Sequence, residues 1–436
     1  MRRYLLTYLP LLTVIVLGPV AAYTDNSAVA AAASSSPAAL VVVGGEGENC
    51  SSDPDCINRF HHDIPMLRRA QPGHALVFKA RDAIDVLGSV DQQTTAPQVL
   101  NSQRFQTLEA NFNAVHPMVG PVYIEGAERG DTLKVTISAI KIGQYGYTFG
   151  GGSGFIGDLV EGGFVAVWDL TAAYATSTDV PGVRIPNRSF PGIIATLPGP
   201  NEQQAMLTRE RKLHEAGGNI FLPTPDAALP KSLCGPEGEA ATDCLRTIPP
   251  REQGGNMDIR HLGVGASVYL PCQLAGCGLM VGDPHYAQGD GEVSGTAIEM
   301  SADITVTTEL IKRHSSLATG PHYEGDASLL NIPSQRFYAV TGLPLKTAGS
   351  SYPSMQYLGS DVSDDLENLS NDLDLSARNA VDGIIDYIVE TYGYSRNQAY
   401  VIASVAVDLR ITQLVDNPNV GVTAVLPLDI FIAPPK

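Results

Sequence analysis

The chain of 436 residues is poor in basic residues, with 28 Lys and Arg against 46 Asp and Glu, and its formal net charge is −18. Nowhere does the sequence contain a block rich in Lys or Arg. Because nucleic acids and anionic membranes are bound through basic surfaces, neither is expected as a partner. Charged residues make up only 17% of the chain and hydrophobic residues 44%, which is enough to form a large core.

Three motifs that mark common classes of enzyme or metal site are also missing. The sequence has no GxSxG serine motif, no GK[ST] phosphate loop and no CxxC pair. A serine hydrolase of the elbow type, a P-loop nucleotide enzyme and a zinc site built on CxxC are therefore not favoured.

One apolar run stands out, at the start of the chain. Residues 1–22, MRRYLLTYLPLLTVIVLGPVAA, combine two arginines, an apolar stretch and small residues, which predicts a secretory signal peptide cleaved near Ala22. A single membrane anchor is the alternative, but the run is short for a span and prolines lie at both ends of it. We therefore expect a secreted, extracellular protein.

The six cysteines fall into three pairs that are close in sequence, as is typical of small disulfide loops in exported proteins. The predicted bonds are Cys50–Cys56, Cys234–Cys244 and Cys272–Cys277. Three sequons, at Asn49, Asn187 and Asn368, would accept glycans in a eukaryotic host.

The pattern of strands and turns predicts a mainly β protein. We expect a flexible leader with a small disulfide loop at 23–60, in which the run Leu40 to Val43 could pair as a strand. A β-sandwich, jelly-roll-like core is expected at 61–300, and a smaller C-terminal α+β module at 301–436.

Individual elements follow from composition and periodicity. Strands are expected at 75–84, 120–127, 131–142, 162–170 and 266–273. The glycine-rich segment 143–157 is interpreted as a mobile loop, and residues 265–283 as a hairpin that turns at 273–276. An apolar stripe predicts a helix that ends at Gly393, and Ser395 is the expected N-cap of a second helix.

The stretch VGDPHYAQGDGEVSGTAIEM, residues 281–300, concentrates charge in a chain that has little of it. It holds four carboxylates and an imidazole among four glycines, at Asp283, His285, Asp290, Glu292 and Glu299. Pro284 favours an extended backbone before it, which would place Asp283 and His285 on one side of an exposed-edge strand. Carboxylates packed this closely repel one another unless a proton or a cation compensates.

With GGNMD upstream, this stretch closely resembles the acetamidase/formamidase family of amide hydrolases, in its GGN-x-D, GD-x-H, QGDGE and AIE segments. The resemblance extends over about Ala70 to Pro427, through PGHALVFKARDA, GPVYIEGAERGDTLKV and AYVIASVAVDLRITQLVDNPNVGVTAVLP. It implies a β-sandwich core and hydrolysis of short linear amides, such as formamide or acetamide, to a carboxylate and ammonia. The signature positions here are Asn256, Asp258, Asp283, His285, Gln288, Asp290, Glu292 and Glu299, with Glu125 in the YIEGA segment.

Amide hydrolysis needs a strong nucleophile, an oxyanion stabiliser and a proton donor for the leaving amine. Our first hypothesis is a metal-activated water, with Asp258, Asp283 and His285 holding a divalent ion. Zinc is the expected ion, with calcium or manganese as alternatives because oxygen ligands dominate. The expected catalytic residues are Glu292, Glu299, Glu125 and Gln288.

Two alternatives remain open. Without a metal, Ser294 or a carboxylate would be the nucleophile, activated by His285; relatives often carry Cys at the position of Ser294. In the other alternative the chain is a secreted binding protein that has kept the fold and lost catalysis. The expected partners are a small amide substrate and further copies of the chain in a homo-oligomer, with no membrane after signal cleavage. The pair His61 and His62, beside Asp63, is interpreted as solvated.

Overall fold

The structure is a computed structural model that describes six ranges of residues. They are residues 40–93, 112–218, 220–313, 321–355, 363–414 and 418–432. The predicted signal peptide and the leader up to residue 39 lie outside this range.

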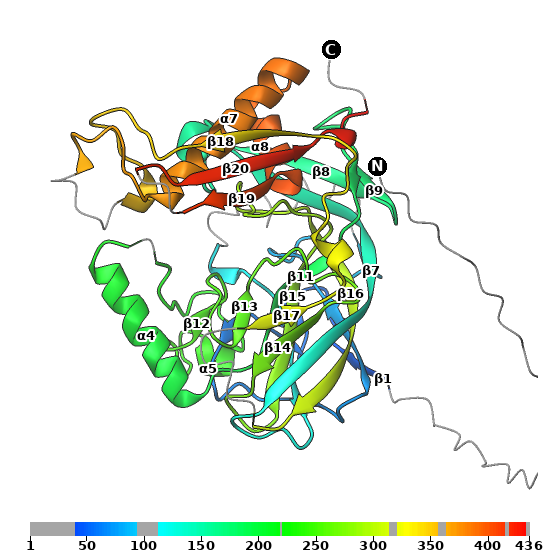
Figure 1. Cartoon of the computed structure of the whole chain (residues 1–436). Coiled ribbons are helices and arrows are strands. Elements are labelled where there is room, and N and C mark those ends of the chain that lie inside the picture. The colour runs from blue at the N-terminus through cyan, green and yellow to red at the C-terminus, as the bar shows by residue number, and fades with distance from the viewer. Residues whose placement is uncertain are drawn as a thin grey trace, which may run out of the picture. The chain divides into compact units, whose positions relative to one another are not determined.

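A sheet of 15 strands dominates the described residues, and most of its pairs are antiparallel (Figure 1). Its two longest strands, β7 and β16, pair from Thr132 and Ile311 to Tyr147 and Glu299. The strands of this sheet are β1 Leu40–Val43, β2 Cys56–Ile57, β4 Arg68–Ala70, β5 Ala75–Ala80, β6 Met118–Ile124, β7 Thr132–Gly150, β8 Phe164–Leu170, β9 Tyr174–Thr176, β10 Ile185–Pro186, β11 Phe190–Ala195, β13 Gly254–Asn256, β14 Ser267–Pro271, β15 Cys277–His285, β16 Glu299–Ile311 and β17 His322–Glu324.

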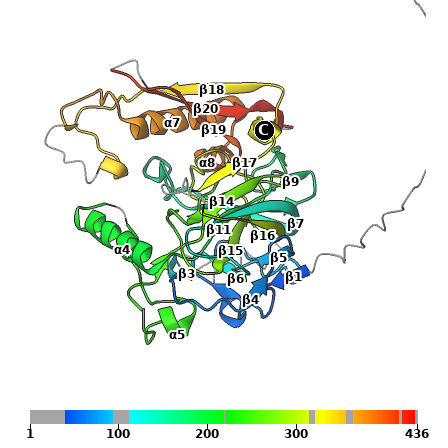
Figure 2. The same ribbon diagram turned by 60° about the horizontal axis from the view of Figure 1, so that its bottom comes forward.

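The C-terminal part adds a three-stranded sheet, β18 Phe337–Gly342, β20 Gly421–Pro427 and β19 Asp408–Gln413, with helices α7 Leu373–Tyr392 and α8 Arg396–Ala406. Helix α7 lies along this sheet, and both views show α8 between that layer and the large sheet (Figures 1 and 2). As predicted, α7 ends at Gly393, whose φ of 75° is left-handed, and the side chain of Ser395 caps α8.

Two further helices lie beside the large sheet: α4 Pro200–Glu215 and the short α5 Lys231–Cys234. Our sequence analysis did not predict α4. Its Met206 and Leu207 are buried in a core cluster with Phe60 and Met280. The two-stranded sheet of β3 Arg59–Phe60 and β12 Leu245–Arg246 lies next to this cluster. Short 3-10 turns are η1 Cys50–Ser52, η2 Phe112–Ala114, η3 Gly157–Leu159, η5 Ala327–Leu330, η6 Pro353–Met355 and η7 Leu428–Ile430.

The mainly β fold with a small C-terminal α+β region is confirmed, and so are the three predicted disulfides. The run Leu40–Val43 forms β1, which pairs in parallel with β5. The division at residue 300 stays a prediction about modules, although that boundary falls inside β16, which belongs to the large sheet along its length.

Two predicted elements are wrong. The segment 143–157 is not a loop throughout, because β7 continues to Gly150. A side chain at Gly146 would collide with the carbonyl of Glu299, 2.7 Å from an added Cβ, so glycine here permits close pairing of β7 and β16. The predicted hairpin does not form either, because β14 pairs with β7 while β15 pairs with β6, β11 and β16.

Candidate active site

Four neighbouring segments bring the predicted residues together. Strand β15 ends with Asp283 and His285, and β16 begins with Glu299, which is the direct cross-strand partner of His285. The connection between these strands carries Glu292, and Asp258 follows β13. Residues facing each other on adjacent strands have close Cβ atoms, so this pairing sets the imidazole against a carboxylate.

The imidazole of His285 is at the centre of the resulting cluster. Its Nε2 lies 3.2 Å from Glu299 Oε2, 3.5 Å from Asp283 Oδ2 and 4.0 Å from Glu292 Oε1. Asp258 offers a further carboxylate oxygen within 4.8 Å of ligand atoms of Asp283 and His285. We call these five residues the buried cluster.

Three members of the buried cluster have backbones in the left-handed region. The φ angles are 50° at Asp258, 53° at Asp283 and 43° at Glu292. Asp283 is therefore not extended, contrary to the expectation from Pro284. Non-glycine residues rarely adopt this conformation, and such strain is typical of functional sites because the surrounding structure must enforce it.

Gln288 fixes the orientation of the central histidine. Its Nε2 donates to the backbone carbonyl of Asp258 at 2.9 Å, which leaves its Oε1 to face His285 Nδ1, also at 2.9 Å. Since an amide oxygen only accepts, Nδ1 carries the proton and donates it to Gln288. The structure thus gives Gln288 a positioning contact and aims Nε2 at the carboxylates.

The wall of the cluster behind His285 is formed by β11. Phe190 packs edge-on against the imidazole, with ring centroids 5.1 Å apart. A Cβ added at Gly192 would lie 2.8 Å from His285 Cε1 and 2.9 Å from Asp258 Oδ1. Only glycine therefore lets the histidine and this carboxylate approach each other here.

Burial and mutual repulsion shift the protonation of the carboxyls. Burial raises the pKa of Glu292 and of Glu299 to about 8, and raises that of Asp258 well above its usual range. Burial also acts on Asp283, but His116 and His285 outweigh it and lower the pKa of Asp283. For His285, burial is outweighed by Glu299 and Asp283, which raise the pKa well above its usual range.

The donor set of the buried cluster fits a divalent cation. Two overlapping groups could hold an ion, namely Asp258 with Asp283 and His285, and His285 with Glu292 and Glu299. Four buried atoms of the cluster lack a hydrogen-bond partner: Asp258 Oδ1, Asp283 Oδ1, His285 Nε2 and Glu299 Oε2. Buried polar atoms are normally satisfied, so these four unpartnered atoms are the ones that could ligate a cation.

Other predicted residues lie elsewhere. Glu125 forms an exposed ion pair with Arg69, whose Nε is 2.7 Å away, so the structure does not bring it to the cluster. Asp290 turns away from Glu292 and accepts a hydrogen bond from Arg260 at 2.9 Å. The hydroxyl of Ser294 donates to the carbonyl of Phe149 at 2.6 Å, which does not support a nucleophilic role beside His285.

Two expectations about histidines are also wrong. His285 is not an exposed-edge side chain, because it is fully buried. His61 is buried as well, at 5% exposure, so the neighbouring pair is not simply solvated. For His285, the covering element is β11, which is remote in sequence.

The sequence analysis missed three buried groups near the cluster. His116 has a pKa lowered by burial and interacts electrostatically with Asp283 and His285. Tyr147 faces Glu299 across β7 and β16, and its hydroxyl donates to Asp82 at 2.8 Å. The quoted segment PGHALVFKARDA contains Asp82, so its acidic end was the available signal for this pair.

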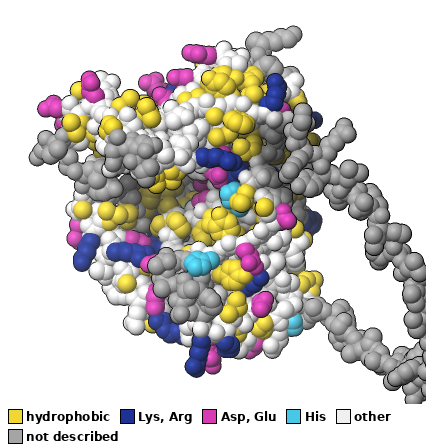
Figure 3. Space-filling model, in the orientation of Figure 1, with side chains coloured by type: hydrophobic (Ala, Val, Ile, Leu, Met, Phe, Trp, Pro, Cys, Tyr) yellow, Lys and Arg dark blue, Asp and Glu magenta, His cyan; other side chains and the backbone are white. Residues whose placement is uncertain are grey.

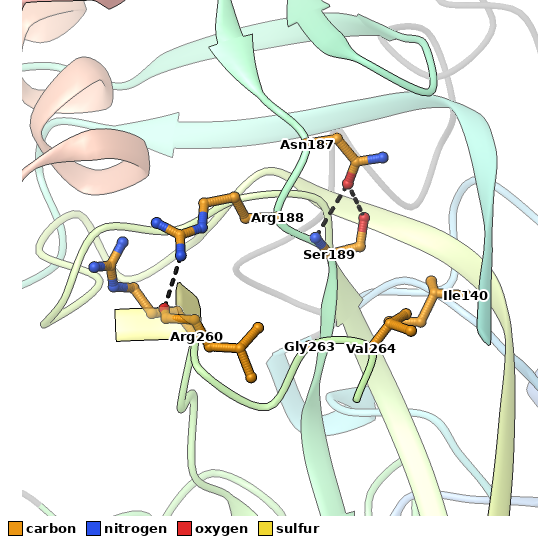
Figure 4. Close-up of a pocket in the computed structure, with 8 residues that line it drawn as sticks. Ile140, Asn187, Arg188, Ser189, Arg260, Gly263 and Val264 are labelled. Atoms are coloured by element: carbon orange, nitrogen blue, oxygen red, sulfur yellow. Dashed lines mark hydrogen bonds between the residues drawn. The ribbon is translucent and has the colours of Figure 1, made fainter. Parts of the chain in front are cut away.

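A separate cavity of about 270 Å³ lies beside the segment that follows Asp258 (Figure 4). Arg188 and Arg260 line it, together with Asn187, Ser189 and apolar side chains. Its polar groups already have partners: Arg188 donates to the carbonyl of Leu329 at 2.7 Å, and Arg260 pairs with Asp290 and Asp408. We therefore assign no ligand to this cavity.

The chain belongs to the acetamidase/formamidase family, whose model matches residues 46–433. It is 30% identical over 407 residues to a formamidase from Methylophilus methylotrophus, covering 87% of this chain and 90% of that protein. It is also 30% identical over 377 residues to an acetamidase from Mycolicibacterium smegmatis, covering 79% and 84%.

Among solved structures, the fold is similar to that of a gamma lactamase from Delftia acidovorans. The TM-score is 0.75 at 26% sequence identity, and the match covers 91% of this chain and 95% of that one. The resemblance inferred from the sequence is thus confirmed at the level of family and fold.

Proposed function

We propose that the protein hydrolyses short amides to a carboxylate and ammonia at the buried cluster. The observation that carries this proposal is the convergence of four carboxylates on His285 Nε2 at the ends of β15 and β16. Membership of the acetamidase/formamidase family supports it, as does the similarity to relatives named formamidase and acetamidase.

Asp258, Asp283 and His285 are the proposed metal ligands, with zinc as the ion. Calcium and manganese remain alternatives, since four of the five residues of the buried cluster offer carboxylate oxygens. A bound divalent ion would polarise the amide carbonyl and acidify a water molecule. Gln288 holds His285 in the tautomer that presents Nε2 to the ligand set.

Glu292 is the proposed proton carrier. At 18% its side chain is the more exposed of the two glutamates, whereas Glu299 is 2% exposed, so a substrate meets Glu292 first. A pKa of about 8 lets a carboxyl both take up and release a proton near neutral pH, as protonation of the leaving amine requires. Glu299, whose Oε1 accepts from the backbone N–H of Ala297 at 2.8 Å, is proposed to hold His285 and to share that proton.

The substrate is proposed to be a small linear amide of the formamide or acetamide type. Asp283, His285 and Glu299 are buried, whereas Asp258 and Glu292 are only partly buried, and such enclosure favours a small substrate. A second candidate is a cyclic amide, because the gamma lactamase of Delftia acidovorans has the same fold over nearly its full length.

We further propose that the protein is exported and is a homo-oligomer. The predicted signal peptide and the three disulfides support export, and disulfides persist in oxidising compartments. Glycans at Asn49, Asn187 and Asn368 would follow in a eukaryotic host. Among the described residues no helix has the length and apolar character of a membrane span.

Lys and Arg side chains are scattered over the face that Figure 3 shows, among Asp and Glu side chains.

Metal-depleted protein provides the test. Ammonia release should be measured with formamide, acetamide, propionamide and 2-pyrrolidinone, before depletion with a strong chelator, after it, and after adding back zinc, calcium or manganese. We expect release from a linear amide that disappears on depletion and returns with one of the ions. Full activity of the depleted protein would contradict the metal, and no release under any condition would favour the non-catalytic binding protein.

A further inference from the structure

A second histidine–carboxylate group lies just after β3, at His61, His62 and Asp63. Asp63 Oδ2 is 3.3 Å from His62 Nε2 and 3.9 Å from His61 Nδ1, and the two imidazoles stack with centroids 4.3 Å apart. One potential ligand atom from each residue lies within 4.8 Å of the others. We call this group the surface triad, because the side chain of Asp63 is 65% exposed.

The tautomer of His62 is fixed from outside the triad. Gln203, on α4, accepts from the backbone N–H of His62 at 3.0 Å, and its Oε1 lies 2.8 Å from His62 Nδ1. The amide of Gln203 cannot be reversed without loss, because its Nε2 donates to the carbonyl of Asp243 at 2.9 Å. In the neutral imidazole of His62 the proton is therefore on Nδ1, and Nε2 presents a lone pair.

The lone pair of His62 Nε2 faces a carboxylate oxygen at 3.3 Å, which is an unfavourable contact between two acceptors. His61 also directs an unprotonated ring nitrogen toward Asp63. Its Nδ1 accepts a hydrogen bond from the backbone N–H of Asp63 at 3.2 Å and so carries no proton. Burial lowers the pKa of His61, which favours its neutral form. Among the described residues Asp63 has no Lys or Arg partner to offset its charge.

We propose that His61, His62 and Asp63 form a second divalent-metal site, separate from the buried cluster and suited to zinc. Two imidazole nitrogens and one carboxylate oxygen are a donor set that zinc prefers, whereas calcium and magnesium favour oxygen alone. The ion replaces the weak N–H contact to His61 Nδ1 and removes the repulsion at His62 Nε2.

Gln203 has the role that an outer-sphere partner has in metal sites. A ligating histidine usually donates its other ring N–H to an oxygen that fixes the ring, and removal of this oxygen typically weakens metal binding by tenfold to a hundredfold. The Nδ1 proton of His62 is held in this way by a buried side chain on a helix 141 residues away. This is the feature that distinguishes the surface triad from a chance pair of exposed histidines.

Zinc binding by the full-length protein tests the proposal, with free zinc reported by a competing chromophoric chelator. His62→Ala should bind one equivalent of zinc per chain fewer than the wild type and should release ammonia from amides at the same rate. Asp63→Asn should weaken the binding of that equivalent by about tenfold or more. His322→Ala, which removes an exposed histidine outside both groups, is the matched control and should bind as the wild type does.

Asp283→Asn separates the two sites, since it should leave the zinc of the surface triad in place. If His62→Ala binds as many equivalents as the wild type, the proposal is wrong. Should His62→Ala fail to fold, the exposed Asp63→Asn decides alone, and unchanged zinc affinity in that variant also overturns the proposal.

Discussion

The buried cluster and the surface triad use the same local arrangement in different surroundings. In each, a histidine Nδ1 lies 2.8 to 2.9 Å from a glutamine Oε1, and that glutamine donates to a backbone carbonyl at 2.9 Å. Nε2 then faces carboxylate oxygen in both. The difference is that His285 is fully buried among four carboxylates, while His62 is partly exposed beside one.

This difference indicates what each group can do. Burial raises the pKa of Glu292 and Glu299 to about 8, so the buried cluster can carry protons at neutral pH as well as ligate an ion. The surface triad lacks a second carboxylate and an enclosed space, so we assign it ion binding alone. Catalysis of amide hydrolysis needs the proton carrier as well as the ligands.

The largest difference between the two groups is expected when each histidine is replaced with glutamine. His285→Gln should lower kcat/KM for amide hydrolysis by at least about a hundredfold, because the proposed ligand atom, Nε2, is lost. His62→Gln should leave kcat/KM unchanged. Ammonia release by both variants, with circular dichroism to confirm folding, checks this; equal losses would show that the two groups act together.

A second, more local test concerns the lack of room for a side chain at Gly192 on β11. In Gly192→Ala the new methyl would lie 2.8 Å from His285 Cε1 and 2.9 Å from Asp258 Oδ1, forcing these groups apart. We expect kcat/KM to fall by about a hundredfold, since displacements of about 1 Å at a catalytic group have such effects. Gly163→Ala, where an added Cβ has nothing within 4 Å, is the control and should retain activity.

The smallest expected effect is on stability as a function of pH. In metal-free protein the folded-state pKa of Glu292 is about 8 against an ordinary value of 4.5, so folding retains a proton that the unfolded chain releases. The contribution of this group is fully present below pH 4.5 and is lost as pH rises to about 8. Glu292→Gln should therefore gain stability relative to the wild type by about 1 kcal/mol per pH unit across that window.

Urea unfolding at pH 5, 6, 7 and 8 with a chelator present measures this gain. Glu125→Gln is the surface control, because Arg69 lowers the pKa of Glu125 and gives it the opposite sign. If the free energies of unfolding of Glu292→Gln and the wild type differ by the same amount at pH 5 and pH 8, burial does not raise the pKa of Glu292.

The members of the buried cluster could be predicted from the sequence because they lie in short ordered segments. The family motif placed Asp258, Asp283, His285 and Glu292 together, and spacing alone predicted the three disulfides. The left-handed backbone at Asp283 could not be predicted, since Pro284 favours an extended residue before it and only the surrounding fold overrides that preference.

Contacts between remote segments account for the other differences between expectation and structure. Glu125 occupies a motif position, yet Arg69, 56 residues earlier, binds it at the surface. The contact of His62 with Gln203 depends on α4, a helix that the sequence analysis missed. The end of β7 was interpreted as a loop because it is rich in glycine. These glycines allow close packing against neighbouring segments and do not mark turns.

Anomalous diffraction from crystals of zinc-loaded, catalytically active protein tests the central claim most directly. Data collected on both sides of the zinc absorption edge would locate each ion and its ligands. The account predicts a peak bonded to Asp258, Asp283 and His285 Nε2 in the buried cluster, at about 2.0 to 2.2 Å from the donor atoms. An active crystal with no anomalous peak in the cluster would contradict a metal-assisted site there.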